Sequence, residues 1–153
     1  MNITLTELEI EMSGMVGLKR NLLAVMRGYK GKHGVDESKN WDLNIEGACA
    51  ELAVAKAINR YWEPTNGTFK SGADIGKNIQ VRRRSKAGGD LIIRRDDNPE
   101  HIFFLITGSV PNFTVQGWIK GQNGMKEEYL QGYGGRELAF FVPQNALSMA
   151  GLE

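Results

Sequence analysis

Cysteine is nearly absent from this chain of 153 residues, in which Cys49 is the single example. One cysteine excludes an internal disulfide framework and a multi-cysteine zinc site, and it is typical of a reducing compartment. No stretch approaches the roughly 20 apolar residues that a membrane-spanning helix needs. The N-terminus has no basic segment followed by an apolar run, so we expect no secretory signal and a cytoplasmic location.

The chain also lacks an excess of charge of either sign, since its formal net charge is +1. A nucleic-acid partner would therefore need a local basic patch, because the protein as a whole is not basic. The composition is otherwise that of a globular protein, with 41% hydrophobic and 24% charged residues. This length fits one domain with its own core, so we treat residues 1–153 as a single domain.

A helical pattern occupies the N-terminal region, residues 1–40. Thr4 and Glu7 have the spacing of a capping box at the start of a helix. Apolar residues then recur at helical spacing, at Leu5, Leu8, Met12, Met15, Leu22 and Met26. Gly14 and Gly17 weaken the middle of this pattern, which leaves two shorter helices as an alternative to one.

A second helix and a series of strands are predicted after this region. The polar segment Lys30–Asn40 indicates a loop, and the helix is expected over Asn44–Tyr61, with Pro64 ending it. Strands are predicted over Thr68–Phe69, Asn78–Arg84, Leu91–Arg94, Ile102–Thr107, Thr114–Ile119 and Leu138–Val142. Glycine-rich residues 121–136 are expected to cover a sheet edge or to fold locally. This order predicts an α+β domain with helices packed on one sheet.

An acid on the inward face of the second helix is the most informative residue. At about 100° per residue, Glu51 falls inside the apolar arc of that helix. The other members of this arc are Gly47, Ala48, Leu52, Val54, Ala55 and Ile58. A buried carboxylate needs a compensating cation, and the sequence leaves open whether this is a metal ion or a basic side chain. The same projection turns Glu46 toward solvent and Cys49 away from the arc.

A second acid, Asp74, precedes a strand with one polar face. Because side chains alternate along a strand, one face carries Gln80, Arg82 and Arg84, and the other carries Ile79, Val81 and Arg83. The two apolar residues predict that the second face packs on the helices. If Asp74 bends back toward the polar face, it meets Glu51 beside an amide and a cation. Such a set suits metal-assisted hydrolysis of a phosphodiester.

At these residues the sequence resembles the PD-(D/E)XK nuclease superfamily, which includes restriction endonucleases and Holliday-junction resolvases. In that family a helix supplies a glutamate, a strand start supplies an aspartate, and the following strand carries (D/E)-x-K. Glu51 and Asp74 match the two acids, and Gln80-Val81-Arg82 takes the place of (D/E)-x-K. Phe113–Ile119 is similar to the closing strand of small phage-type members.

The resemblance implies a restriction-endonuclease-like fold, with a central mixed β-sheet flanked by helices. Residues 44–121 would then be the catalytic core, and residues 122–153 a C-terminal loop and strand. Glu51, Asp74 and Gln80 would hold Mg²⁺ (or Mn²⁺), while Arg82 would stabilise the pentavalent phosphate.

Two residues depart from the family pattern. Gln80 replaces an acid and is a weaker ligand for a cation. Arg82 replaces a lysine, and arginine stays protonated, so it can clamp a phosphate but cannot act as a general base. The candidates to supply the missing lysine are Lys70, Lys77 and Lys120.

A cluster of basic residues lies close in sequence to the proposed metal ligands Asp74 and Gln80. It predicts contacts with the DNA backbone through Arg83, Arg84, Lys86 and Arg94. The leading hypothesis is a metal-dependent DNA endonuclease of a bacterium or a phage-infected host cell, and cleavage of both strands favours a homodimer. One alternative is a catalytically inactive nucleic-acid-binding module on the same fold. Another is a viral structural or protein-interaction domain, with the N-terminal helix as its assembly surface.

Overall fold

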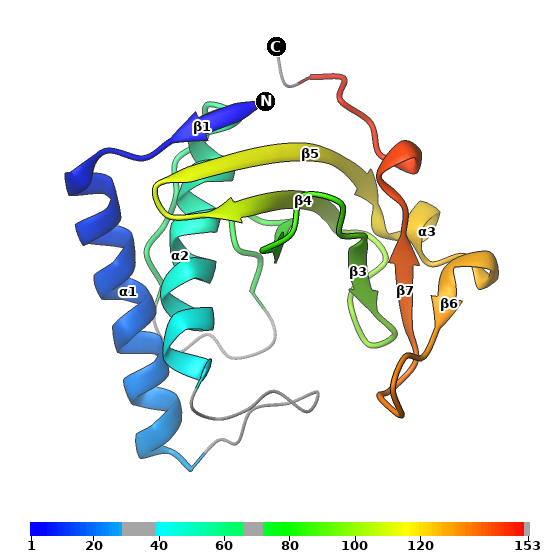
Figure 1. Cartoon of the computed structure of the whole chain (residues 1–153), viewed down its shortest axis with the longest axis horizontal. Coiled ribbons are helices and arrows are strands. Elements are labelled where there is room, and N and C mark those ends of the chain that lie inside the picture. Colours follow the sequence, from blue (N-terminus) through cyan, green and yellow to red (C-terminus); the bar gives the residue numbers. More distant parts are fainter. Residues whose placement is uncertain (29–38, 66–71, 152–153) are drawn as a thin grey trace.

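The polypeptide is arranged in three layers in the computed structural model, which describes residues 1–28, 39–65 and 72–151 (Figure 1). Two N-terminal helices form the first layer, a mixed four-stranded sheet the second, and a small antiparallel sheet the third. The predicted α+β class is therefore confirmed, but the prediction of one sheet is wrong, because the strands form two sheets. Helices cover one face of the central sheet, whereas the small sheet covers the other.

The chain begins with a strand, β1 (Asn2–Thr4), which pairs with a strand formed much later in the sequence. The first helix, α1 (Glu7–Met26), therefore starts after this strand. Its capping box lies two residues later than predicted: the Thr6 hydroxyl accepts a hydrogen bond from the Glu9 amide, and the Glu9 carboxylate accepts one from the Thr6 amide. The prediction was shifted because it assigned the strand residues to the helix.

Gly17 allows α1 to approach the second helix, α2 (Asn40–Ala57), very closely. A Cβ atom added at Gly17 would lie 2.4 Å from the carbonyl oxygen of Asn44. The helix α1 is continuous through Gly14 and Gly17, so the alternative of two shorter helices is wrong. Gly17 is buried at the crossing point. Glycine lowers helix propensity there, but tertiary packing outweighs that cost.

The second helix starts earlier and ends earlier than predicted. It ends in a Schellman motif, in which Asn59 adopts a left-handed φ of 52°. The Arg60 amide donates to the Ala55 carbonyl oxygen at 2.8 Å, and the Asn59 amide donates to that of Lys56 at 3.3 Å. This motif satisfies the last carbonyl groups and stops the helix well before Pro64.

The central sheet has the strand order β1-β5-β4-β2. Its further members are β2 (Ile79–Arg84), β4 (Ile102–Ser109) and β5 (Asn112–Lys120). β2 runs parallel to β4, whereas the other two pairs are antiparallel. β2 therefore forms one edge of the sheet, and these three strands confirm the predicted ones to within two residues at each end.

The small sheet has the order β3-β7-β6, from β3 (Leu91–Arg94), β7 (Ala139–Val142) and β6 (Leu130–Gln131). The glycine-rich segment folds locally as α3 (Gly121–Gly124), a 3-10 turn (Glu127–Tyr129) and β6. A second 3-10 turn (Gln144–Ala146) follows β7. The predicted strand at Thr68–Phe69 lies outside the described residues.

Alternate residues of β4 contribute to two separate cores. Phe104 and Ile106 belong to the core shared with the helices, whereas Phe103 and Leu105 belong to the core shared with the small sheet. All four side chains are at most 5% exposed. The central sheet is thus buried on both faces, which explains the continuous apolar run in β4.

Cys49 points into the protein, which corrects its predicted orientation. The run Ala48–Glu51 is buried throughout, because α2 lies between α1 on one side and the sheet on the other. The hydroxyl of Ser13 donates to the Cys49 sulfur at 3.2 Å. Burial raises the pKa of the Cys49 thiol.

No helix among the described residues combines the length and the apolar character needed to cross a membrane.

Candidate functional site

Glu51 lies on the buried side of α2, as predicted, and is only 8% exposed. Arg20 of α1 holds its carboxylate by two hydrogen bonds of 2.7 and 3.0 Å. The indole N–H of Trp62 donates a third, at 3.0 Å. A basic side chain therefore compensates the buried charge, which is one of the two possibilities that the sequence left open. The sequence did not identify Arg20 or Trp62, because neither has a short-range relation to Glu51.

All three nitrogens of the Arg20 guanidinium group donate hydrogen bonds. Its Nε atom donates to the carbonyl oxygen of Thr65 at 2.9 Å, while its two terminal nitrogens hold Glu51. The bidentate arrangement is the geometry that arginine and carboxylate groups prefer. Arg20 therefore links α1, α2 and the chain after α2 at this point.

Asp74 lies along the outer edge of β2. Its amide donates to the carbonyl oxygen of Ile79 at 2.8 Å, and its carboxylate accepts the amide of Val81 at 2.7 Å. Ile75 forms an isolated bridge with Ile79. The segment before β2 thus turns back along this strand, as the sequence suggested.

Burial raises the pKa of Asp74 to about 6, and the negative charge of Glu51 acts in the same direction. The Val81 amide and the positive charges of Arg82 and Arg20 act in the opposite direction. Two acids far apart in the sequence therefore lie within electrostatic range of each other and of two arginines. An acid with a raised pKa beside a second acid is a common feature of functional sites.

Gln80 points to the predicted polar face of β2 and is held by three neighbours. Its amide nitrogen donates to the Gly72 carbonyl oxygen at 3.1 Å and lies 3.2 Å from Nδ1 of His101. Its amide oxygen accepts a hydrogen bond of 3.2 Å from Arg82. The orientation of this amide is therefore set, with its oxygen toward Arg82.

Arg82 shares this face and is paired with an acid that the sequence did not indicate. One terminal nitrogen donates to both carboxylate oxygens of Asp97 at 2.9 Å. The guanidinium carbon lies 5.2 Å from the centre of the Phe103 ring, within cation–π range. Asp97 also accepts the Arg94 amide at 2.7 Å, so the turn before β4 is built around this carboxylate.

Arg83 points to the opposite face of β2, toward α2. It donates to the Gly108 carbonyl oxygen at 2.9 Å and the Ser109 hydroxyl at 2.7 Å, and it lies 3.4 Å from the Glu46 carboxylate. Glu46 also accepts the Val110 amide at 3.2 Å, so it is not the solvated charge that its helical phase predicted. The predicted alternation of faces along β2 is confirmed.

Three other predicted basic residues gather around the turn after β2. Arg84 and Lys86 line one concavity. Arg84 also lines a second, which we call the arginine pocket, with Arg94 and Arg136. The arginine pocket is completed by Gly88, Gly89, Asp90, Ile92, Tyr133, Gly134, Glu137 and Phe141.

The aromatic part of the arginine pocket is an edge-to-face pair. The rings of Tyr133 and Phe141 have centroids 4.8 Å apart and planes at 88°. Arginine side chains beside an aromatic surface suit a ligand with phosphates and flat rings. The sequence did not identify Arg136 or Tyr133, because they lie in the glycine-rich segment, far from β2 along the chain.

Comparisons with protein-family models, curated proteins and solved structures found no match.

The fit of this set to a divalent cation depends on Glu51 and on Gln80, whose amide oxygen already accepts a hydrogen bond from Arg82. Two carboxylates and an amide oxygen are the hard donors that Mg²⁺ takes. However, Arg20 holds both oxygens of Glu51, so a cation would have to displace one of these bonds. Within the described ranges, no three His, Cys, Asp or Glu side chains are grouped in a way that could hold a metal ion.

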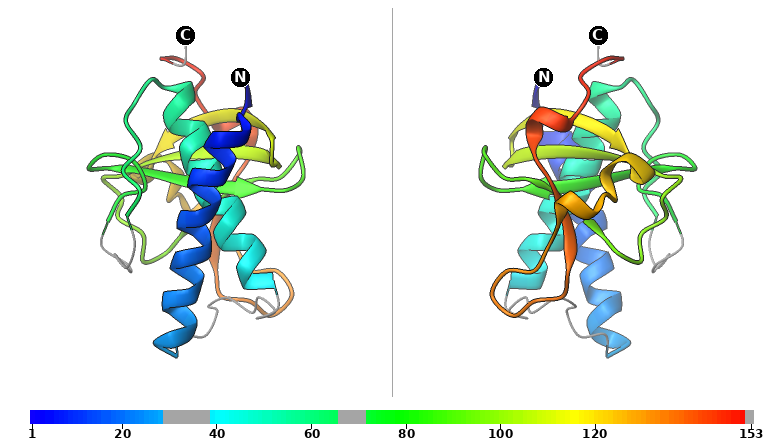
Figure 2. Two further views of the ribbon diagram at one scale, coloured as in Figure 1. Left: turned by 90° about the vertical axis from the view of Figure 1, so that its left-hand side faces the viewer. Right: turned by 90° about the vertical axis from the view of Figure 1, so that its right-hand side faces the viewer.

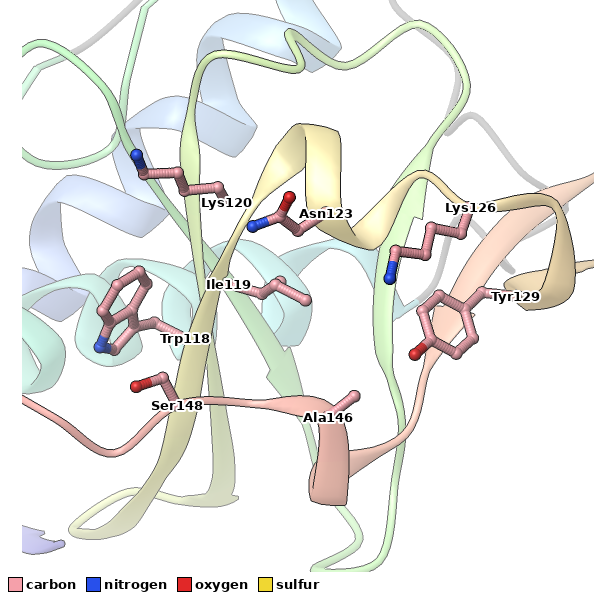
Figure 3. Close-up of a pocket in the computed structure, with 8 residues that line it drawn as sticks. All are labelled: Trp118, Ile119, Lys120, Asn123, Lys126, Tyr129, Ala146 and Ser148. Atoms are coloured by element: carbon pink, nitrogen blue, oxygen red, sulfur yellow. The ribbon is translucent and has the colours of Figure 1, made fainter.

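A separate pocket contains Lys120, one of the candidates for the missing lysine. It lies at the end of β5 and is lined by Trp118, Ile119, Lys120, Asn123, Lys126, Tyr129, Ala146 and Ser148 (Figure 3). None of these residues contributes to the Glu51 and Asp74 contacts described above. Lys77 is exposed in the turn before β2, and Lys70 lies outside the described residues.

Proposed function

We propose that this chain is a metal-dependent DNA endonuclease of the PD-(D/E)XK type, on a restriction-endonuclease-like fold. The observation that carries the proposal is a pair of acids: Glu51 is buried on α2, and Asp74 is fixed on the outer edge of β2 by the Val81 amide. The charge of Glu51 contributes to the raised pKa of Asp74. Arg82 acts on the same carboxylate from β2. The proposed setting is the cytoplasm of a bacterium or of a phage-infected host cell.

Asp74, Glu51 and the amide oxygen of Gln80 are the residues that would hold Mg²⁺ or Mn²⁺. The ion, when bound, polarises the phosphodiester and lowers the pKa of the attacking water. Arginine stays protonated in proteins, so Arg82 would offset negative charge that develops on the phosphate. Asp97 and the Phe103 ring fix the orientation of its guanidinium group.

The DNA backbone would be bound by Arg84, Lys86 and Arg94 around the turn after β2. Arg136 adds a fourth cation next to Arg84 and Arg94 in the arginine pocket. Such contacts hold phosphates without reading the base sequence. Arg83 is engaged by Glu46 and by two groups at the end of β4, so we assign it to holding α2 against the sheet.

An inactive nucleic-acid-binding module is the second candidate, and two pairs of residues favour it. Arg20 already neutralises Glu51, and Asp97 already neutralises Arg82. A site whose charges are compensated internally has less need of a metal ion. Replacement of an acid by Gln80 points in the same direction.

Supercoiled plasmid incubated with Mg²⁺ or Mn²⁺ separates these candidates. The endonuclease nicks the plasmid, and both Asp74→Asn and Glu51→Gln lose the nicking while still retarding DNA in a gel. Glu128→Gln, which changes an exposed acid in a 3-10 turn, serves as the matched control and keeps full activity.

Retardation without nicking by the unaltered protein supports the binding module. Nicking that survives both substitutions contradicts the proposed site. A protein that retains no DNA even at low salt, where phosphate contacts are strongest, fits the third class, a viral structural or protein-interaction domain.

A further inference from the structure

The described residues of the chain leave one long face of helix α1 uncovered. Seven large apolar side chains on it are between 40% and 76% exposed. They form what we call the apolar stripe: Leu8, Met12, Met15, Leu18, Leu22, Val25 and Met26. At 1.5 Å per residue, the stripe is about 27 Å long. Monomeric proteins rarely expose a continuous apolar patch of this kind without a partner for it.

The apolar stripe lies on the side of α1 that faces away from α2. The buried residues of α1 are Ser13, Gly17 and Asn21, which point to the α2 side and are small or polar. Figure 2 shows α1 along the outside of the helical layer, in front of α2 in the left-hand view. Ile10 and Val16 of α1 pack against the core, but the seven side chains of the apolar stripe face outward. A helix whose sole partner is the rest of its own chain usually keeps its large apolar side chains on the buried side.

Five of the seven residues of the apolar stripe, Leu8 to Leu22, are placed symmetrically about Met15. Leu8 and Leu22 stand seven residues before and after Met15, which is two turns in each direction. Met12 and Leu18 stand three residues before and after it. A two-fold axis through Met15 therefore places apolar residues at the same level on two antiparallel copies of α1.

Two charged residues within the apolar stripe follow the same symmetry with opposite signs. Glu11 precedes Met15 by four residues and Lys19 follows it by four, and both side chains are exposed. In an antiparallel pair of helices, Glu11 of each copy lies at the level of Lys19 of the other. In a parallel pair, Glu11 lies at the level of Glu11, and like charges repel.

We infer that the apolar stripe binds a second copy of this chain, as an antiparallel two-fold dimer centred on Met15. Such an interface is isologous, since the same surface is used by both copies and is complementary to itself. It is one helix wide on each side, which places it at the small end of the range of specific interfaces. The inference uses none of the residues assigned to the nuclease site and does not depend on that proposal.

Sedimentation equilibrium of the full chain tests the inference. We expect the mass of the unaltered protein to approach twice 17.0 kDa as its concentration rises. Met15→Glu places two acids at the two-fold axis and should weaken the dimer at least about tenfold. Leu138→Glu is the matched control, because it puts the same charge on an exposed leucine (46%) beside β7 and should leave the mass unchanged.

A charge exchange tests the direction of the two helices with surface residues that folding does not need. Glu11→Lys alone and Lys19→Glu alone each set like charges against each other and should weaken the dimer. The double variant restores opposite charges in the antiparallel arrangement and should recover the affinity. Circular dichroism confirms that every variant is folded.

Three results would overturn the inference. The first is a protein that stays monomeric up to hundreds of micromolar, as expected if another segment of the chain covers the stripe. The second is a dimer that Met15→Glu leaves intact. The third is a double charge variant that is weaker than both single variants, which excludes the antiparallel arrangement.

Discussion

Two arginines of this protein are each held by an acid through two hydrogen bonds. Arg20 of α1 binds Glu51 of α2, and Arg82 of β2 binds Asp97, which lies in the turn before β4. The first pair is the more deeply buried, with side-chain exposures of 20% and 10%. Removal of one partner from such a pair leaves an uncompensated charge, which costs more than the pair itself contributes.

For this reason we expect Arg20→Ala to lower the free energy of unfolding by about 3 kcal/mol. Adding Glu51→Gln to this variant removes the stranded charge and should recover most of the loss. Chemical denaturation at pH 7 measures both effects. Arg60→Ala, at an exposed arginine just after α2, should stay within about 0.5 kcal/mol of the unaltered protein. An equal loss in the single and double variants would show that the charge of Glu51 is not the cause.

Asp74 makes stability depend on pH in the direction opposite to that of most carboxylates. Its pKa in the folded protein is about 6, against an ordinary value of 3.8, so the folded state binds more protons between these two values. The free energy of unfolding therefore falls as pH rises through this window, and the loss is complete above pH 6. Because the side chain is partly exposed, we expect the loss to be about 1–2 kcal/mol.

The Asp74→Asn variant should lack this component of the pH dependence. Its amide oxygen can still accept the Val81 amide, so it should be more stable than the unaltered protein at pH 8 and similar at pH 4. Thermal unfolding at a series of pH values measures the difference. Identical pH profiles for the two proteins would rule out a raised pKa for Asp74.

At the scale of elements, the contact between α1 and α2 depends on one glycine. Gly17 is buried where the helices cross. A Cβ atom added at Gly14, one turn earlier, would lie 3.8 Å from the Cγ2 atom of Ile45, which is an ordinary contact distance. Gly17→Ala should therefore force the helices apart and cost about 1–3 kcal/mol. Gly14→Ala should be neutral or stabilise the helix by up to about 1 kcal/mol. Denaturant midpoints for the two variants provide the comparison, and equal effects would contradict the observed crossing.

At the scale of the whole molecule, the central sheet joins two cores into one structure. Val54 is fully buried in the core on the helix side, and Ile93 is fully buried in the core on the small-sheet side. Val54→Ala and Ile93→Ala should each cost about 2–4 kcal/mol. Both should shift the same single transition, seen alike by circular dichroism and by tryptophan fluorescence. Separate transitions in either variant would show that the small sheet unfolds independently.

The fold follows from local patterns more closely than the site does. The alternation along β2 and the position of Glu51 in its helix were predicted because each depends on a few neighbouring residues. The partners Arg20, Trp62 and Asp97 were not predicted, because long-range pairs depend on how the layers meet. The outward projection of Glu46 was wrong for the same reason, since α2 is enclosed by both α1 and the sheet.

The hydrogen bond from Val81 to Asp74 also bears on solubility. It occupies a backbone amide on the outer edge of β2, where an unpaired strand would offer a template for β-strands of other molecules. Asp74→Ala would remove this acceptor and open that edge to aggregation, so its loss of activity would be ambiguous. The asparagine variant keeps the edge closed and tests the chemistry alone.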